Sequence, residues 1–272
     1  MAFDPIGPAP AALRPGFRRI AEQVADHLRA RILRGDLADG DLLPKEEDLR
    51  DGYDVSKSSF REAMRILEAE GLLTVRRGNV GGAVIHRPSP GNVAYTLAVV
   101  LSARAVTIDD VAKALLQVEP ACAALCAARP DRLASVVPAL VAVHDNSMEA
   151  VGDLVAATRW SRRFHETLVS SCGNDTLIVM VGALETLWSS HETGWAESHT
   201  HPSSLPVEER RQALESHQEL IDLIIEGDVE GARDLAARHL GEVQGYPATP
   251  NSMIVRPDLA REHRSPTSPP DI

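Results

Sequence analysis

The stretch that most constrains the fold is residues 55–73, VSKSSFREAMRILEAEGLL. Its apolar residues recur at i, i+3, i+4 and i+7, the spacing of one face of an amphipathic helix; they are Phe60, Ala63, Met64 and Leu67. Ser56 is a good N-cap, because its hydroxyl can accept a hydrogen bond from a backbone N–H that has no partner within the helix. Gly71 follows the last turn, where a left-handed residue commonly ends a helix. The pattern therefore predicts one capped amphipathic helix.

The opposite face of this helix is rich in cations and hydroxyls over its first turns. It carries Lys57, Ser58, Ser59, Arg61 and Arg65. Such groups, together with the free backbone N–H groups of a helix N-terminus, suit phosphate oxygens and guanine edges. Taken alone, the segment is explained at least as well by an ordinary solvated surface helix.

The neighbouring segments favour a nucleic-acid-binding motif. The preceding run, LLPKEEDLRDGYD, predicts a short helix at about 45–51 and a turn centred on Gly52. Two helices joined by a short glycine-containing turn, the second one basic, are typical of a helix-turn-helix. After Gly71, two β-branched runs at 74–75 and 83–85 flank a tip that contains Arg76 and Arg77, which predicts a β-hairpin wing.

Three consecutive runs, GDLADGDLLPKEEDL, VSKSSFREAMRILEAEGLL and the glycine-containing wing, resemble the GntR winged-helix transcription regulators over residues 17–87. In that family the first helix, here 17–33, packs behind the helix-turn-helix pair. The resemblance implies DNA contacts from the start of the recognition helix, an arginine in its second turn and the wing tip. The corresponding positions are Ser56, Lys57, Ser58, Ser59, Arg61, Arg77 and Gly78, and Arg65 lies on the same helix face.

Two departures from the family pattern affect these contacts. Lys57 stands where many relatives have Arg, and lysine cannot make the bidentate contact to guanine that arginine makes. The run LPKEE has Lys45 and Glu47 where relatives have Ser before the Glu and, in some cases, Arg after it. Because Glu47 cannot hold a phosphate, either that contact is missing or Lys45 replaces it.

Charge separates the chain into two parts. The first 90 residues hold 14 basic and 14 acidic residues, so the whole net charge of −11 lies beyond them. An acidic second part argues against another nucleic-acid surface and fits a dimerisation and sensing domain. Cys122 and Cys126 are expected to be small core residues, since three cysteines form neither a disulfide framework nor a zinc ribbon. We expect no membrane span and no signal peptide, and hence a cytoplasmic protein.

The predicted fold is mainly α, with an N-terminal winged helix-turn-helix domain and a C-terminal all-α bundle. Residues 1–16, with four prolines, are expected to be a disordered tail, and 88–106 a linker with a connecting helix at 93–101. Short connections predict an antiparallel bundle over 107–245. Its helices are expected at about 108–128, 131–147, 150–171, 175–196, 207–226 and 229–243. Residues 246–272, with six prolines and no apolar stripe, are expected to be a second disordered tail.

Histidines are the notable polar residues of the second part. His165, His217 and His239 each share an apolar stripe of a different predicted helix. A single histidine in such a place is usually a hydrogen-bonded core residue. Three on three helices of one bundle can converge, and neutral imidazoles are good ligands for Zn, Ni, Cu or Fe.

The runs VEPACAALCA, FHETLVSSCGNDTL and H-x21-H resemble the FCD effector-binding domain. Counting the helix at 93–101, seven helices favour the FadR group over the six-helix VanR group. In metal-binding members the corresponding three histidines are ligands, which implies a divalent metal, Zn, Ni or similar, at His165, His217 and His239. Those relatives usually have an Asp where this chain has Ser161, and often an Arg where it has Leu115, so metal affinity should fall and a usual anchor for an acidic effector is absent. Ser161 and Arg162 are then candidates for binding an effector. Arg163 is the alternative to Arg162, and a solvent-facing role is the default expectation for each arginine.

The sequence thus predicts a homodimeric regulator, not an enzyme, that binds a double-stranded DNA operator and is released as a repressor by a small organic acid or similar metabolite. A metal-free sensor with an apolar or acyl effector is the alternative. A helical metalloenzyme is disfavoured, because no carboxylate or nucleophile has a diagnostic spacing from the histidines and the winged helix would be unexplained. The effector, the target genes, the metal and the direction of regulation are left open.

Overall fold

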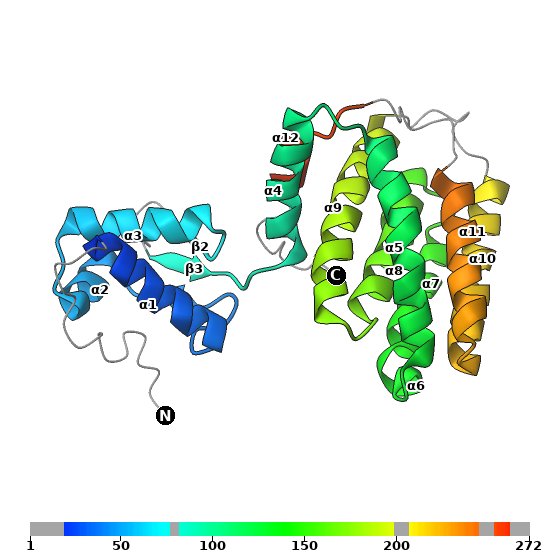
Figure 1. Ribbon diagram of the computed structural model, residues 1–272, viewed down its shortest axis with the longest axis horizontal. Coiled ribbons are helices and arrows are strands. Elements are labelled where there is room, and N and C mark those ends of the chain that lie inside the picture. The colour runs from blue at the N-terminus through cyan, green and yellow to red at the C-terminus, as the bar shows by residue number, and fades with distance from the viewer. Residues whose placement is uncertain (1–18, 77–81, 199–206, 245–252, 262–272) are drawn as a thin grey trace. The chain divides into compact units, whose positions relative to one another are not determined.

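The computed structural model describes residues 19–76, 82–198, 207–244 and 253–261 (Figure 1). These residues form two compact units, divided between Asn92 and Val93. The expected tail at 1–16 lies outside the described residues, as does the wing tip with Arg77 and Gly78. The two units are taken in turn.

The first unit is a small three-helix domain with a three-stranded antiparallel sheet of order β1-β3-β2. Its elements are α1 (Ile20–Arg34), β1 (Leu42–Leu43), α2 (Glu46–Tyr53), α3 (Lys57–Ala69), β2 (Leu73–Val75) and β3 (Ala83–Ile85). Leu73 pairs with Ile85 in the hairpin, and Leu42 pairs with Val84. The apolar faces of α1, α3 and the sheet meet in one core that includes Leu28, Phe60, Leu67 and Ile85. The expected winged helix-turn-helix is confirmed, with β1 as an additional strand.

Local chemistry accounts for the ends of α3. The Ser56 hydroxyl accepts a hydrogen bond from the Ser59 N–H at 3.2 Å, which confirms the predicted N-cap. Gly71, with φ of 73°, provides the left-handed residue after the helix. The predicted turn at Gly52 is wrong, because Gly52 lies inside α2. The chain turns instead at Asp54, whose φ is 51°. Aspartate adopts this region more readily than most residues, because its short polar side chain can hydrogen-bond locally.

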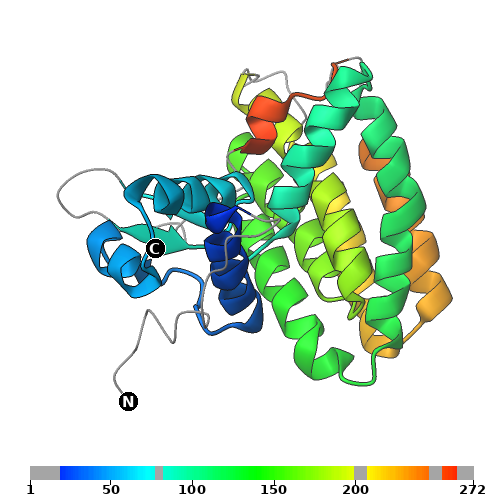
Figure 2. The same ribbon diagram turned by 60° about the vertical axis from the view of Figure 1, so that its left-hand side comes forward.

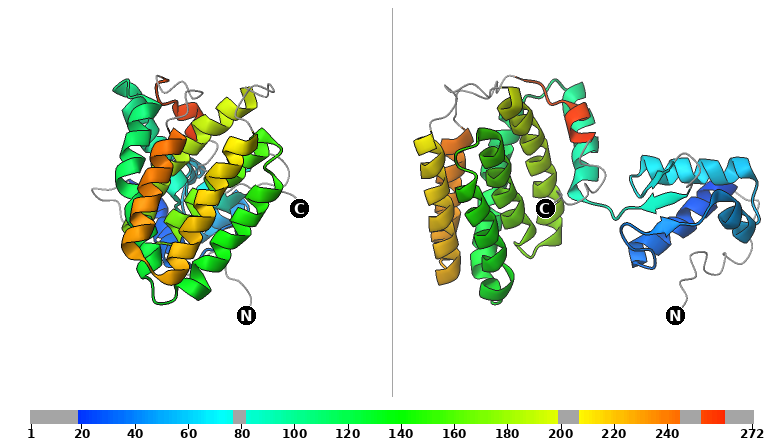
Figure 3. Two further views of the ribbon diagram at one scale, coloured as in Figure 1. Left: turned by 90° about the vertical axis from the view of Figure 1, so that its right-hand side faces the viewer. Right: turned by 180° about the vertical axis from the view of Figure 1, so that it is seen from behind.

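The second unit is all helical. It contains α4 (Pro90–Ala103), α5 (Ile108–Ala128), α6 (Arg132–Ser135), α7 (Val137–Glu149), α8 (Leu154–Ser170), α9 (Asp175–Ser198), α10 (Val207–Glu226), α11 (Val229–Gln244) and α12 (Pro257–Arg261). Six long helices pack around one interior in the cyclic order α5–α11–α10–α7–α8–α9 (Figure 3). The predicted helix at 131–147 is instead two helices. Pro138, in the first turn of α7, favours the start of a helix there because its missing N–H is not needed.

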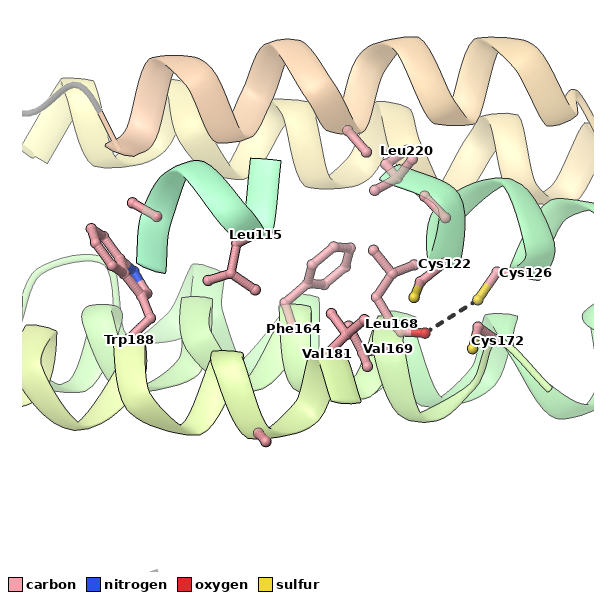
Figure 4. Close-up of a cluster of buried hydrophobic side chains, with 14 of the residues drawn as sticks. Leu115, Cys122, Cys126, Phe164, Leu168, Val169, Cys172, Val181, Trp188 and Leu220 are labelled. Atoms are coloured by element: carbon pink, nitrogen blue, oxygen red, sulfur yellow. Dashed lines mark hydrogen bonds between the residues drawn. The ribbon is translucent and has the colours of Figure 1, made fainter. Parts of the chain in front are cut away.

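The interior of this bundle is apolar along most of its length. Leu115, Phe164, Leu168, Val181 and Trp188 are buried between the helices (Figure 4). Cys122, Cys126 and Cys172 are buried and free at one end of this cluster, and the Cys126 thiol donates to the Leu168 carbonyl at 3.2 Å. The cysteines are therefore small core residues, as predicted.

The structure differs from the expectation of a disordered tail at residues 253–261. The Ile108 N–H donates to the Met253 carbonyl at 2.9 Å, and the Val255 N–H donates to the Val106 carbonyl at 3.0 Å. Val255 and Ala260 are buried, and α12 packs against α9 (Figure 2). A few apolar residues within a proline-rich segment thus find a partner surface that no local periodicity indicates. The remaining tail residues, 245–252 and 262–272, lie outside the described residues.

Helix α5 corrects the expectation that no apolar run approaches the length of a membrane span. By length and mean hydropathy, Ile108–Ala128 is sufficient to cross a membrane. However, 56% of its most apolar window is buried within the bundle. That burial is what a core helix of a bundle shows, because the apolar face of α5 packs against α9 and α11.

Candidate metal centre and nucleic-acid interface

Three histidines from three helices meet inside the second unit. His165 lies on α8, His217 on α10 and His239 on α11, and all three are buried. One ring nitrogen from each lies within 4.8 Å of the others. The Nε2 atoms of His217 and His239 are 3.0 Å apart. The structure thus brings together the three residues that the sequence singled out.

The packing around the three rings holds them in fixed orientations. Phe164 stacks on His217 with ring centroids 4.0 Å apart and planes 8° from parallel. The rings of His165 and His239 are nearly parallel, with centroids 5.3 Å apart. Each imidazole is therefore restrained by an aromatic neighbour.

The protonation state of the three histidines suits a metal. Burial lowers the pKa of His165 to about 3 and that of His239 to about 2, and it lowers the pKa of His217 well below its ordinary value. Neutral imidazoles are the form that binds metals, so no net loss of protons is needed; the Nε2 contact of His217 and His239 makes one of these atoms a donor, and that ring changes tautomer when both bind one ion. Two nitrogens that each lie about 2.1 Å from one ion at a right angle are about 3 Å apart, which matches His217 and His239. The donor set fits a divalent transition metal.

Charged side chains that the histidine pattern does not include surround this centre. The Arg162 guanidinium is only 2% exposed, whereas Arg163 faces solvent and pairs with Glu166 at 3.0 Å. Sequence reasoning assigned both arginines a solvent-facing role by default, and the structure corrects this for Arg162. Its positive charge contributes to the low pKa of His165 and His239. Arg162 is thus a buried cation beside the histidines.

Two buried glutamates complete the cluster. Glu119 of α5 and Glu185 of α9 are 1% and 0% exposed. Burial raises the pKa of both carboxyls, and their mutual contact raises that of Glu185 further. Sequence reasoning quoted Glu119 only as part of a motif and did not consider Glu185. The available signal was the presence of each carboxylate within an otherwise apolar helical run, VEPACAA and VGALETLW.

The two positions at which the sequence departs from metal-binding relatives lie on helices that line the same interior. Ser161, half-buried on α8, is one turn before His165, so it shares that helix face. Leu115 is fully buried in the apolar cluster, one turn before Glu119 on α5. Ser161 therefore occupies the position of the aspartate, and Leu115 occupies the position of the arginine.

The first unit presents the predicted polar face of α3 to solvent. Lys57, Ser58, Arg61 and Arg65 are exposed, and Ser59 is half-buried. The Ser56 hydroxyl hydrogen-bonds the hydroxyls of Ser58 and Ser59 at 3.0 and 2.9 Å. Hydroxyl groups, cations and the helix N-terminus are thus gathered at one end of α3, an arrangement that suits phosphate oxygens.

Acidic residues of α2 modify this face. Arg61 donates from Nε to the Glu46 carboxylate at 3.0 Å while its side chain stays 57% exposed. Glu46, which sequence reasoning did not consider, therefore holds Arg61 in one direction. Lys45 is exposed just before α2, and Glu47 is exposed in its first turn. Of the two, only Lys45 can attract a phosphate.

A winged helix-turn-helix followed by a helical bundle with a buried polar centre defines a class of protein, the DNA-binding regulators that carry a sensor domain. The comparisons assign the chain within that class. Residues 20–82 match the model of the bacterial regulatory proteins of the gntR family, and residues 110–242 match the FCD domain. The chain belongs to the GntR family of transcription regulators and is not an enzyme.

The similarity to known transcription regulators extends over most of the length of both chains. A protein of Escherichia coli (strain K12) named for regulation of the L-lactate dehydrogenase operon is 30% identical over 233 residues, covering 83% of this chain and 85% of its own. The Exu regulon transcriptional regulator of the same organism is 26% identical, covering 82% of each chain. Among solved structures, a GntR protein of Streptococcus agalactiae is 25% identical with a TM-score of 0.59, covering 82% of this chain and 98% of its own.

Proposed function

We propose that the protein is a cytoplasmic homodimeric repressor of the FadR group, released from an inverted-repeat operator by a small organic acid. The observation that supports this most directly is the buried cluster of the second unit. Three neutral imidazoles, a guanidinium and two carboxyl groups lie together inside the bundle. Buried polar groups of this kind are costly unless they are partnered or used, and a sensor domain is a reason to retain them.

The proposed metal ligands are His165, His217 and His239. When bound, a divalent ion held by three imidazoles offers open coordination positions to oxygen ligands. The chain itself contributes the neutral donors, a site closed to bulk solvent, and Ser161 in place of a fourth charged ligand. Ser161 leaves room for an oxygen of the effector.

The proposed effector is an acid because of Arg162. A guanidinium stays charged even when buried, and its planar donors match a carboxylate. Arg162 lies close enough to the histidines to lower the pKa of His165 and His239. The name of one similar protein refers to the L-lactate dehydrogenase operon, which agrees with a small organic acid as the effector and does not specify the acid for this chain.

The proposed DNA contacts come from the first unit. They are Lys45, Ser56, Lys57, Ser58, Ser59, Arg61 and Arg65, with Arg77 and Gly78 of the wing tip assigned from the sequence alone. Two copies bind the two halves of an inverted repeat, because the symmetry of a dimer is reflected in its operator. The acid lowers operator affinity only as far as it binds the DNA-incompetent arrangement more tightly than the competent one.

The metal-free sensor remains the second candidate. The stacking of Phe164 on His217 favours it to a degree, since such a pair also occurs in ordinary apolar cores. In that case the effector is apolar or acyl and the three histidines are core residues. Elemental analysis of the purified protein separates the two candidates.

A His217→Ala variant tests the proposed function. Operator DNA is first obtained by selection from random sequences, and its affinity is measured by fluorescence anisotropy with a panel of small hydroxy and keto acids. We expect the variant to contain less metal, to bind the operator as the wild type does, and to lose at least tenfold of the response to the acid. His191→Ala, another buried histidine of the same bundle, is the matched control and should retain the response.

The result that contradicts the proposal is specific. Metal-free wild-type protein that answers the same acid at the same concentration would exclude a role for the metal. The metal-free sensor would then replace the metal-dependent one.

A further inference from the structure

The contact between Glu119 and His165 determines which nitrogen of His165 faces the cluster. The Nδ1 atom of His165 and the Oε1 atom of Glu119 are 2.6 Å apart, and both side chains are almost completely buried. Glu119, as a carboxylate, accepts this hydrogen bond, so Nδ1 carries the proton and donates. In a neutral imidazole this leaves the lone pair on Nε2.

The Nε2 atom is the one that is free to bind an ion. It is buried and has no hydrogen-bond partner among the residues that the structure describes. The His165 ring as a whole faces the other two imidazoles, with its centroid 5.2 Å from that of His217 and 5.3 Å from that of His239, and its Nδ1 is taken by Glu119. A bare lone pair in an apolar interior is unfavourable unless a ligand satisfies it, so the tautomer set by Glu119 is the one that a metal ion requires.

Glu185 supports Glu119 from a third helix. The two buried carboxyl groups of Glu119 and Glu185 lie close enough for each to shift the pKa of the other. Glu185 approaches from α9, while Glu119 and His165 lie on α5 and α8. The chain of contacts therefore links three helices to one imidazole ring.

We infer that Glu119 is a positioning residue of the metal centre, which holds His165 with Nδ1 protonated and Nε2 turned toward the ion, and that the neighbouring Glu185 acts on the centre through Glu119. A carboxylate behind a ligating histidine fixes the orientation of the ring and raises its basicity. This matters more in the present chain than in one with four ligands, because the position of the usual carboxylate ligand is occupied by Ser161. The inference rests on the metal-binding part of the proposed function.

The test uses the isosteric variant Glu119→Gln in the full-length protein. Its affinity for Co²⁺ is measured by the visible absorption of the bound ion and by competition with a chromophoric chelator. We expect affinity about 10- to 100-fold below that of the wild type, together with a changed absorption spectrum. Glu185→Gln should lower affinity less, because it acts through Glu119.

Glu166→Gln is the matched control. Glu166 adjoins His165 in sequence but is partly exposed and pairs with Arg163, so Co²⁺ affinity should stay within about twofold of the wild type. An equal loss in both variants would overturn the inference, as would unchanged Co²⁺ affinity and an unchanged spectrum in Glu119→Gln.

A measurement on unmodified protein decides the question even if Glu119→Gln does not fold. Nitrogen-15 NMR of the metal-free wild type should show His165 neutral and protonated at Nδ1, with a strongly downfield N–H proton. Protonation at Nε2 would overturn the inference. Failure of the proposed function is recognised separately, because His217→Ala would then leave the metal content of the protein unchanged.

Discussion

At the scale of single residues, burial determines what the polar side chains of the bundle can do. An imidazole that is removed from water loses the hydration that favours its charged form, so His165, His217 and His239 are neutral donors at neutral pH. Arg162 stays charged in the same surroundings. The centre therefore combines imidazole lone pairs with the Arg162 cation and the buried Glu119 and Glu185; in the proposed function, the lone pairs serve the ion and the cation serves the acid.

Ser161→Asp should restore the carboxylate that metal-binding relatives usually have. Because Ser161 lies one turn before His165 on α8, the new side chain shares the face of that ligand. We expect metal affinity to rise roughly tenfold, equivalent to about 1.4 kcal/mol, measured by chelator competition. The response to the acid should weaken, because the carboxylate occupies the place of an effector oxygen.

Ser161→Asn is the control for this substitution, because it has the same size without the charge. Equal metal affinity in the Asp and Asn variants would show that position 161 does not face the ion.

At the scale of elements, the segment after residue 252 contributes to the bundle in spite of its proline content. It pairs by backbone hydrogen bonds with the start of α5, and the Arg256 N–H donates to Nε2 of His191 on α9 at 3.1 Å. Val255 fills an apolar site and is 1% exposed. The segment thus connects the ends of two core helices that are distant in sequence.

Truncation after residue 252 should destabilise the second unit, whereas truncation after residue 261 should not. The shorter chain loses the burial of Val255, which alone is worth roughly 2 kcal/mol, together with these hydrogen bonds. The three tryptophans, Trp160, Trp188 and Trp195, all lie in the second unit, so urea unfolding followed by tryptophan fluorescence reports on that unit. Equal midpoints for the two truncated chains would show that the segment contributes nothing.

At the scale of the whole molecule, net charge and buried histidines are distributed unequally between the two units. The first 90 residues are neutral overall and present an exposed basic helix face, while the net charge of −11 lies in the remainder. Five histidines of the second unit have a pKa lowered by burial, namely His144, His165, His191, His217 and His239. The protein should therefore be sensitive to acid chiefly in its second unit.

The unfolding free energy of the metal-free second unit should fall as the pH is lowered from 7 to 5. A histidine whose folded pKa lies below its unfolded value of about 6.5 binds more protons in the unfolded state, so its stabilising contribution is present above pH 6.5 and lost below it. Each histidine contributes up to about 1.4 kcal/mol per pH unit. The pKa values of Glu119 and Glu185 are raised, so these residues affect the unfolding free energy in the opposite direction. They can offset the contributions of two of the five histidines.

This pH dependence can be measured by urea unfolding at several pH values with tryptophan fluorescence. Zn²⁺ added at pH 7 should steepen it, because protons then compete with the ion for the same nitrogens. A stability that is constant between pH 7 and 5 would contradict the burial of neutral histidines.

Much of the architecture could be predicted because it depends on local periodicity. The stripe of Phe60, Ala63, Met64 and Leu67 predicts α3, and Ser56 and Gly71 predict its ends, since capping depends only on neighbours in the chain. The three histidines could be selected for a similar reason, because each interrupts an apolar helix face. Errors occurred where local signals compete, as at Asp54 rather than Gly52 and at the break before α7.

The apolar helix faces could be inferred from the order of the residues, and with them a winged helix-turn-helix and a bundle with histidines inside. Which polar groups meet in that bundle depends on how the helices pack. Glu119, Arg162 and Glu185 come from three helices separated by tens of residues, and no pattern within one helix shows which side chain lies opposite another. The packing of Val255 against the bundle could not be predicted from the sequence either, because a single apolar residue has no periodicity. Packing of the helices around one interior brings these groups close to the histidines and excludes water, and the loss of hydration shifts their pKa values.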